Sequence, residues 1–336
     1  MENSENKYLS CDIIETGFDA QIRSIDLCCR VSSQDSPIER FALLKNYNGE
    51  KIDWNEFFKI KQKIRDDFRK GNTFPQCQKC LYIKEENWTK ENYFQAININ
   101  NWIKCNANCV YCDRDTFNHI KAYNIYPVFK SMIENNLLRV GGPITISGGE
   151  PTIIREFDKL LNLFLKHKMK RIKVLTNAIK YNRTIEKGLK IGDVNILVST
   201  DSGTRETFKK IKRTDKHKDV WKNVKKYAQK TINKELVKTK FIVIPGLNDN
   251  EEELFAWLKQ NVENEVKFIE IDLEIAWFYS HLENKEYLDK IYALAKKTFE
   301  KATELNLCIE AKDRMVILFN MYNDCEHKNP CWCGSC

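Results

Sequence analysis

The stretch YFQAININNWIKCNANCVYC, residues 93–112, decides the fold, because it joins a short apolar run to a loop with three cysteines. The run at residues 94–100 is of the length and composition of a buried strand. Cys105, Cys109 and Cys112 follow it at the spacing C-x3-C-x2-C. Three thiolates on one short loop can hold three corners of a four-iron cluster and leave the fourth iron open to a small molecule. The alternative is a structural zinc site, which requires four closed ligands.

Further apolar runs follow this stretch and alternate with longer, charged amphipathic segments. The runs lie at residues 143–148, 171–177, 194–200, 240–246 and 268–277. The helix-like segments lie at residues 115–136, 154–168, 204–231 and 250–262, and another lies earlier, at residues 53–69. Six strands, most of them followed by a helix, predict parallel βαβ units and therefore an α/β fold, either a barrel or an open sheet. Since active sites of such units form at the carboxyl ends of the strands, we expect the cysteine loop at that rim.

Motifs at the ends of the later strands, together with the cysteine loop, resemble the radical S-adenosylmethionine (SAM) superfamily over residues 93–280. They are Ser147-Gly-Gly-Glu-Pro151, Thr176-Asn177, Val198-Ser-Thr-Asp-Ser-Gly203 and the segment IVIPGLN at residues 242–248. The resemblance implies a partial (β/α)6 TIM-like barrel of the radical SAM type with cysteine-rich N- and C-terminal extensions. It divides the chain into an N-terminal extension at residues 1–92, the barrel at 93–304 and a tail at 305–336.

By the same resemblance, Cys105, Cys109 and Cys112 ligate a [4Fe–4S] cluster, and SAM is the second cofactor. The residues implied to contact SAM are Tyr111, Gly148, Gly149, Glu150, Asn177, Ser199, Asp201 and Ile244. Two glycines allow a close approach of backbone to ligand, and a carboxylate can receive the ammonium group of methionine. For Asp201, expected at the ribose and carboxylate, the alternative is a cap for the helix that begins near Thr204. For the isoleucines of 242–248 it is a buried strand and turn.

The remaining cysteines gather at the two ends of a chain that has thirteen in all. No export signal is visible, and reduced thiols at short spacings more often bind metal than form disulfides. Cys28, Cys77 and Cys80, around a Trp-bearing segment, resemble the auxiliary-cluster module called SPASM or its shorter relative, twitch. The tail cysteines are predicted to complete a cluster or to bind one; they are Cys325, Cys331, Cys333 and Cys336. Zinc knuckles are the alternative, and Cys308 is predicted to be a core thiol.

The sixth apolar run has an acidic face. Glu270, Asp272 and Glu274 alternate with apolar residues, which in a parallel barrel should pack outward on the helices. The acidic side chains should then line the interior and meet SAM, a basic substrate or buried Lys and Arg, because unpaired buried carboxylates are costly. A structural salt-bridge network is the alternative. Residues 277–281 would continue to the rim, where Trp277, Tyr279 and His281 would border substrate or pack.

Composition limits the remaining possibilities. The formal net charge is +8, but Lys and Arg are scattered among acidic residues, which indicates a solvated surface and makes a nucleic-acid partner unlikely on charge grounds. The N-terminus has no uninterrupted apolar run, and no stretch approaches the roughly 20 apolar residues that cross a bilayer. We therefore expect a cytoplasmic protein without a membrane partner.

The resemblance implies reductive cleavage of SAM to a 5′-deoxyadenosyl radical that abstracts hydrogen from a substrate. It also implies a one-electron reductant such as flavodoxin or ferredoxin, and auxiliary iron–sulfur clusters. The first hypothesis for the reaction is oxidation or cross-linking of a peptide or protein, since auxiliary modules often accompany that work. The alternatives are a small-molecule substrate such as a sugar or nucleotide, or a non-enzymatic metal-binding scaffold. No residue is identified as a catalytic acid, base or second radical carrier.

Overall fold

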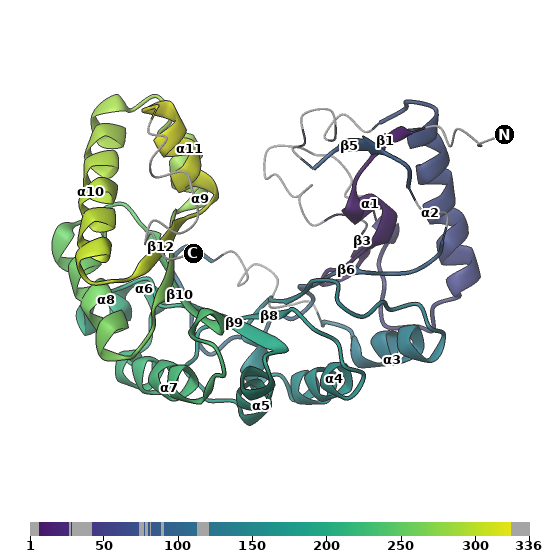
Figure 1. Ribbon diagram of the computed structural model, residues 1–336, viewed down its shortest axis with the longest axis horizontal. Coiled ribbons are helices and arrows are strands. Elements are labelled where there is room, and N and C mark those ends of the chain that lie inside the picture. The colour runs from purple at the N-terminus through teal and green to yellow at the C-terminus, as the bar shows by residue number, and fades with distance from the viewer. Residues whose placement is uncertain are drawn as a thin grey trace. The chain divides into compact units, whose positions relative to one another are not determined.

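The computed structural model describes residues 7–26, 28, 42–73, 77, 80, 82–88, 91–112 and 121–323. They belong to two compact units (Figure 1). Unit 1 comprises Met1–Ile103, Asn118–Gly149 and Ile154–Ile172, and unit 2 comprises Lys104–Phe117, Glu150–Ile153 and Lys173–Cys336. The predicted ligands Cys325, Cys331, Cys333 and Cys336 lie outside the described residues. In the described part of the chain, no helix combines the length and apolar character that a bilayer span needs.

Unit 1 is built on a mixed sheet. Its strands are β1 (Tyr8–Ser10), β2 (Gly17–Ala20), β3 (Ile25–Asp26), β4 (Ala42–Leu44), β5 (Lys84–Glu86), β6 (Ala96–Ile99) and β7 (Ile144–Ile146). Strands β7, β6 and β2 are parallel neighbours, β3 and β4 continue antiparallel, and β1 pairs separately with β5. The first predicted strand, β6, therefore pairs with a strand of the N-terminal segment, where the sequence analysis predicted none.

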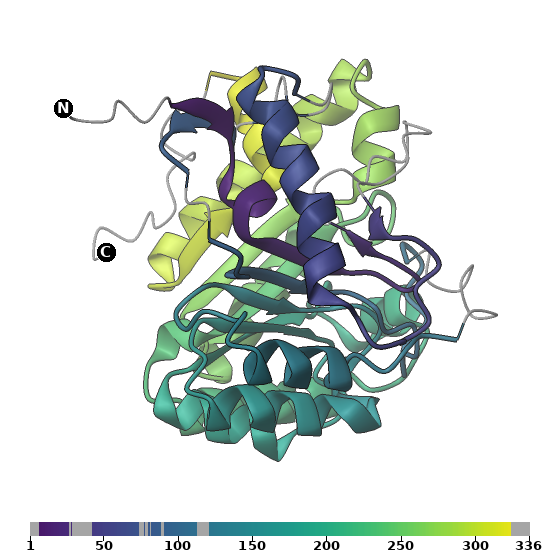
Figure 2. The same cartoon turned by 90° about the vertical axis from the view of Figure 1, so that its right-hand side faces the viewer.

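The helices of unit 1 are α1 (Asp12–Thr16), α2 (Trp54–Arg69), α3 (Tyr126–Glu134) and α4 (Arg155–Lys166). Helix α2 begins where the amphipathic pattern predicts, because the Asp53 carboxylate accepts the Asn55 N–H at 2.9 Å. It runs along the outer side of unit 1 and buries Phe57 and Phe68 (Figure 2). Apolar burial of this kind is the main stabilising contribution to such packing.

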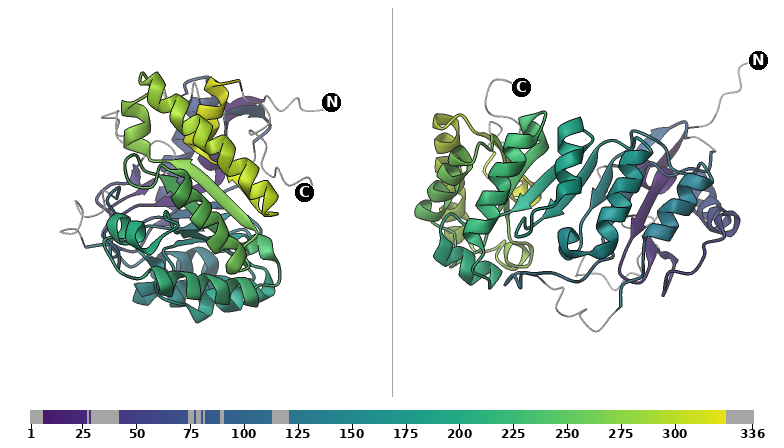
Figure 3. Two further views of the ribbon diagram at one scale, coloured as in Figure 1. Left: turned by 90° about the vertical axis from the view of Figure 1, so that its left-hand side faces the viewer. Right: turned by 90° about the horizontal axis from the view of Figure 1, so that it is seen from below.

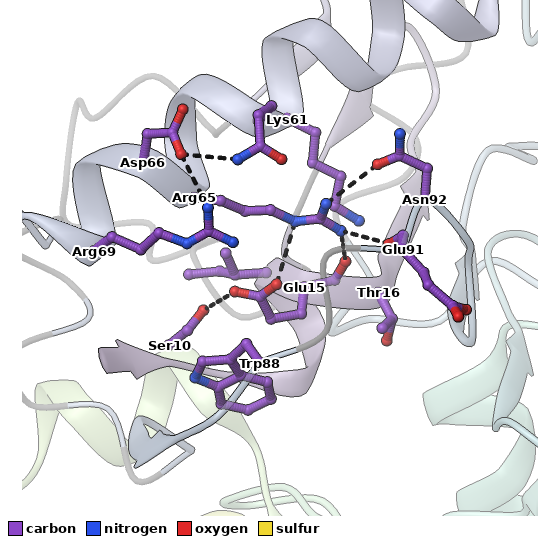
Figure 4. Close-up of polar contacts among 12 residues, drawn as sticks. Ser10, Glu15, Thr16, Lys61, Arg65, Asp66, Arg69, Trp88, Glu91 and Asn92 are labelled. Atoms are coloured by element: carbon purple, nitrogen blue, oxygen red, sulfur yellow. Dashed lines mark hydrogen bonds and ion pairs between the residues drawn. The ribbon is translucent and has the colours of Figure 1, made fainter. Parts of the chain in front are cut away.

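A buried ion pair fastens α2 to α1. The Arg65 and Glu15 side chains are both fully buried, with 3.2 Å between Arg65 Nε and Glu15 Oε2 (Figure 4). Arg65 also donates to the Glu15 carbonyl at 2.7 Å, and the Ser10 hydroxyl donates to Glu15 Oε1 at 2.7 Å. Because a buried charge without its partner is costly, this pair fixes how α2 meets α1.

Unit 2 alternates strands and helices. Its strands are β9 (Val194–Ser199), β10 (Val237–Val243), β11 (Phe268–Leu273) and β12 (Cys308–Ala311), and β8 (Ile172–Thr176) begins at the boundary between the units. Strands β9, β10, β11 and β12 are parallel neighbours in that order. This parallel α/β arrangement confirms the predicted fold class.

Helices α5 and α7 cover one side of these strands and lie in front of them in the view from below (Figure 3, right). The helices of unit 2 are α5 (Arg183–Ile191), α6 (Arg205–Lys212), α7 (His217–Lys230), α8 (Glu251–Glu263), α9 (Ile275–Ser280), α10 (Lys285–Glu304) and α11 (Asp313–Met321). Short 3-10 turns η2 (Pro151–Ile153) and η3 (Lys234–Leu236) complete the unit.

Three predicted elements were wrong in extent. The single helix expected at 204–231 is two, α6 and α7, because Arg213 has the left-handed φ of 52° that ends a helix. The strand expected to reach residue 277 ends at Leu273, and the Glu274 side chain accepts the Ala276 N–H at 3.2 Å where α9 begins. The helix expected from residue 115 begins, in the described residues, only at Tyr126, next to Pro127.

Candidate functional site

The three-cysteine loop is anchored to the end of helix α6 within unit 2. The Asn108 N–H donates to the Lys212 carbonyl at 3.1 Å, and the Val110 N–H donates to the Ile211 carbonyl at 2.9 Å. A tight turn places the Cys112 N–H 3.1 Å from the Cys109 carbonyl. Cys105 and Cys112 are exposed and Cys109 is half-buried, so the loop is fixed in place while its thiols remain accessible.

A buried charged group lies behind the loop. The Tyr111 hydroxyl donates to Asp201 Oδ2 at 2.6 Å, and the Lys212 ammonium donates to the Tyr111 oxygen at 2.8 Å and to Asp201. Burial lowers the pKa of Lys212, but the negative charges of Asp201 and Cys109 raise it above its ordinary value. Burial raises the pKa of the Cys109 thiol, and the Lys212 charge opposes that rise. Lys212 therefore places a fixed positive charge beside a predicted cluster ligand.

Both carboxylate oxygens of Asp201 accept hydrogen bonds from other residues of the protein. It is fully buried, and its Oδ1 accepts the Ile242 N–H at 2.8 Å while its Oδ2 accepts from Tyr111 and Lys212. Asp201 therefore holds the loop and β10 together, and its expected contact with the ribose and carboxylate of SAM stays a prediction. The alternative expectation, a helix cap, is wrong, because the cap of α6 is Thr204, whose hydroxyl accepts the Thr207 N–H at 3.3 Å.

Glu150 connects the end of β8 to the region of the loop. Its buried carboxylate accepts the Thr176 hydroxyl and the Asn177 N–H, each at 2.6 Å. Burial raises the pKa of Glu150, and these hydrogen bonds oppose the rise. The Asn177 amide in turn donates to Asn106 at 2.7 Å and lies 3.7 Å from the Cys105 sulfur. Glu150, expected at the methionine ammonium, thus orients Asn177 against the cysteine loop.

The predicted glycines serve a close approach between backbone segments of unit 1. Gly148 has a φ of 112°, and a Cβ there would lie 2.8 Å from the Trp102 carbonyl oxygen. The Gly149 N–H donates to that same oxygen at 2.7 Å. Only glycine fits at position 148, so the motif is needed for the chain path whether or not a ligand approaches.

The other two residues expected at SAM, Ser199 and Ile244, lie at the end of β9 and directly after β10 in unit 2. Ser199 ends β9 and stands beside Lys240 in register, so both side chains project from the same face. Ile244 is mostly buried, and its N–H donates to the Asn248 side chain at 2.6 Å. The buried strand and turn, weighed as the alternative for this segment, describe Ile244 well.

The N-terminal cysteines form a second group, in unit 1. Cys11 and Cys77 are buried in one apolar cluster with Ile14 and Phe68. The Cys80 N–H donates to the Cys77 carbonyl at 3.0 Å, which is a tight turn, and the Cys11 sulfur accepts the Ile14 N–H at 3.4 Å at the start of α1.

The pKa shifts of Cys11 and Cys77 involve both other N-terminal cysteines, Cys28 and Cys80. Burial raises the pKa of Cys77 to about 12, with further upward contributions from Cys11, Cys28 and Cys80. Burial likewise raises the pKa of Cys11 to about 11, again with contributions from Cys28 and Cys80. The structure thus brings the predicted Cys28, Cys77 and Cys80 together with Cys11, which the sequence analysis did not include; its solitary position in the sequence gave no spacing signal. In the described part of the chain, no three His, Cys, Asp or Glu side chains are grouped as a single metal ion would require.

The acidic side chains of β11 pair with basic side chains. Glu270 and Asp272 are buried, and their Lys and Arg partners are partly exposed. Tyr279 belongs to α9 instead of a strand end and is exposed, and the Trp277 side chain lies outside the described structure.

Comparison with known proteins gives one family. The sequence model of the Radical SAM superfamily matches residues 102–258. GTP 3′,8-cyclase of Clostridium botulinum (strain Hall) is 31% identical over 176 residues, which are 50% of this chain and 53% of that protein. GTP 3′,8-cyclase of Desulforamulus reducens is 27% identical over 194 residues, 54% of this chain and 57% of that protein. The chain thus spans about half the length of the curated relatives it matches.

A solved structure shares the fold. Streptococcus suis SuiB bound to precursor peptide SuiA superposes with a TM-score of 0.52 at 15% identity, over 89% of this chain and 60% of that chain. Together with the family match, this likeness confirms the predicted α/β fold of the radical SAM type.

Proposed function

The chain is a member of the radical SAM superfamily through residues 102–258, and from this premise we propose that it cleaves SAM reductively and starts radical chemistry on a substrate. The cofactors of that superfamily are a [4Fe–4S] cluster and SAM. When bound, the cluster supplies the electron that breaks the sulfonium bond of SAM, which yields methionine and a 5′-deoxyadenosyl radical that abstracts hydrogen from the substrate.

The observation that carries the proposal is the anchored three-cysteine loop. Cys105, Cys109 and Cys112 supply three thiolates, which fit three corners of a four-iron cluster and leave one iron for a ligand. Lys212 and Asn177 hold the two ends of this loop through the contacts described above. The role of these two residues is to position the thiolates before any ligand binds.

We place an auxiliary iron–sulfur cluster at Cys11, Cys28, Cys77 and Cys80. The support is their grouping in unit 1 and the tight turn at Cys77 and Cys80. Four thiolates complete the coordination of such a cluster, so its role is electron transfer from the substrate radical, not substrate binding.

The first candidate substrate is a peptide or protein. An auxiliary cluster suits an oxidation, because it accepts the electron that remains after hydrogen abstraction. SuiB, which shares the fold, is named as bound to a precursor peptide. The second candidate is a nucleotide, favoured by the 31% identity with proteins named GTP 3′,8-cyclase.

The test is anaerobic reconstitution with iron and sulfide, followed by SAM, a strong reductant and measurement of 5′-deoxyadenosine. We expect product from the wild type and none after C105A, C109A or C112A. The matched control is C308A, which removes a buried thiol from β12. Binding of zinc without binding of iron would identify a non-enzymatic metal-binding scaffold and overturn the proposal.

A further inference from the structure

One face of the parallel strands in unit 2 carries a row of charged side chains. Lys240 on β10 is in register with Ser199 on one side and Glu270 on the other, and Glu270 is in register with Glu310 on β12. Side chains at registered positions of parallel strands project from the same face. The charged row therefore continues directly from Ser199, a residue expected at SAM.

Two clusters of ion pairs make up this row. Glu270 Oε1 lies 3.8 Å from the Lys173 ammonium and 3.9 Å from those of Lys238 and Lys312. Glu310 lies 3.5 Å from Lys238 and also pairs with Lys312.

The second cluster adjoins the first. Asp272 lies 3.6 Å from the Lys240 ammonium and pairs with Arg314. Arg314 also lies 3.9 Å from the Asp313 carboxylate. Five cationic side chains thus share four carboxylates, which leaves an excess of one positive charge in this part of unit 2.

The carboxylates and the cations differ in their exposure to solvent. The Glu270 and Asp272 side chains are 4% and 0% exposed, whereas those of Lys173, Lys238 and Lys240 are 36%, 32% and 21% exposed. Glu270 and Asp272 therefore lie beneath the lysines, whereas Glu310 and Asp313 are 24% and 68% exposed. The accessible layer of the network contains four lysines and two carboxylates. A network that served only to fill the interior would bring equal numbers of opposite charges, because each surplus buried charge is costly.

The surplus charge affects Lys173 in particular. Burial lowers the pKa of Lys173, Glu270 opposes this, and the positive charges of Lys312 and Lys238 lower it further. An anion that binds among partly buried like charges reduces the electrostatic repulsion between them.

We propose that Lys173, Lys238, Lys240, Lys312 and Arg314, the basic face, bind an anionic group of the substrate, either a phosphate or a carboxylate. Ammonium groups attract such anions as point charges. The Arg314 guanidinium, which donates to the Leu273 carbonyl and pairs with Asp272 and Asp313, adds its positive charge from beneath. The inference deepens the proposed function and rests on it, because the substrate must reach a radical formed next to Ser199.

The test measures binding separately from chemistry. The reconstituted protein with SAM and no reductant is titrated calorimetrically with tripolyphosphate, GTP and hexaglutamate. The test variant K173Q/K238Q removes two of the five cations and leaves three cations for four carboxylates. The matched control K218Q/K222Q removes two exposed lysines of α7 and causes the same change in net charge.

We expect at least one probe to bind the wild type and the control variant equally, with affinity that falls as salt rises. The K173Q/K238Q variant should bind it at least tenfold more weakly, and K173R/K238R should restore binding. Binding of tripolyphosphate and GTP alone identifies a phosphate, and binding of hexaglutamate alone identifies a carboxylate of an acidic peptide.

Equal binding by wild type and K173Q/K238Q, or binding of no probe by the wild type, would overturn the inference. Thermal unfolding of each variant shows whether a loss of affinity reflects misfolding, in which case K173R/K238R decides. The 5′-deoxyadenosine assay on the wild type tests the proposed function independently, so the two ideas can fail separately.

Discussion

The two cysteine groups of this chain are built on opposite physical principles. In unit 2, Cys105 and Cys112 are exposed on a loop whose stability comes from polar contacts behind it, centred on the buried Lys212. In unit 1, Cys11 and Cys77 are themselves buried in an apolar cluster. The first arrangement keeps thiolates accessible to a small molecule, and the second excludes one. A cysteine therefore stays accessible to a ligand when the residues behind the loop, and not the cysteine itself, make the packing contacts.

Charge differs between the groups as much as exposure does. Lys212 opposes the effect of burial on the Cys109 thiol. Among the described residues, burial and the neighbouring cysteines are the influences on Cys77, and burial raises its pKa to about 12. Cysteine binds metal as its thiolate. The loop thus has a built-in counter-charge, whereas in the N-terminal group burial opposes the thiolate form, which a bound metal would favour.

The largest expected effect comes from removing a ligand of each group in turn. C109A should reduce 5′-deoxyadenosine formation by at least about 10³-fold, because one corner of the cluster is lost. It should also lower the iron content of the reconstituted protein, and C11A should lower it independently. Iron analysis and the electron paramagnetic resonance spectrum of the reduced protein check this. Iron content that C11A leaves unchanged would contradict the four-cysteine group.

The second-largest effect should come from loss of the positive charge of Lys212. K212M leaves the buried Asp201 carboxylate without its cation, so we expect the free energy of unfolding to fall by about 3–5 kcal/mol. Urea denaturation measures it. K209M, at an exposed position of the same helix, should stay within about 0.5 kcal/mol of wild type. Equal stability of the two variants would show that Lys212 does not carry the loop.

The corresponding change in unit 1 should be smaller. R65M removes the ion-pair partner of Glu15, but Ser10 still donates to that carboxylate, so we expect a loss of about 3 kcal/mol. The double variant E15Q/R65M should recover part of this loss, because no buried charge then remains. A double variant less stable than R65M would mean that the pair acts through packing alone.

The smallest expected effect is the loss of the Asp249 carboxylate, which makes ordinary polar contacts in unit 2. Burial raises the pKa of Asp249, but hydrogen bonds from Lys290 and Tyr287 lower it below its usual value overall. A lowered pKa in the folded state stabilises above the unfolded pKa of about 3.9, and that contribution is lost as pH falls through the folded value. D249N should therefore be less stable than wild type by about 1 kcal/mol at pH 7. The difference should disappear once the pH falls below the folded pKa of Asp249, and a constant difference would exclude this origin.

Local patterns allowed much of the fold to be predicted. The strands β6 to β11 and the cysteine loop follow from apolar runs and from spacing, which are properties of neighbouring residues. The break at Arg213 and the helix after Leu273 were missed because both depend on single backbone conformations inside otherwise helical or apolar stretches. The pairing of β2 with β6 is a long-range contact between short strands, which periodicity does not reveal.

The candidate site divides in the same way. The identity of the loop cysteines is local information, but the roles of Glu150 and Asp201 depend on which donors the fold brings to their oxygens. Those donors come from Asn177 and Ile242, 27 and 41 residues away in the chain. Sequence alone predicts a carboxylate near the site. It does not show that the carboxylate oxygens already accept hydrogen bonds from other parts of the protein.

Asn248 orders a whole segment of unit 2 through one side chain. Its amide donates to the Asp201 and Ile242 carbonyls, each at 2.8 Å, and its oxygen accepts the Ile244 N–H at 2.6 Å. The Gly246 N–H is also held, by the Asp249 side chain at 2.8 Å. A segment tied at so many points has few conformations left to lose. A ligand that binds against it will therefore do so with little entropy penalty from the backbone and with an association rate not slowed by loop closure.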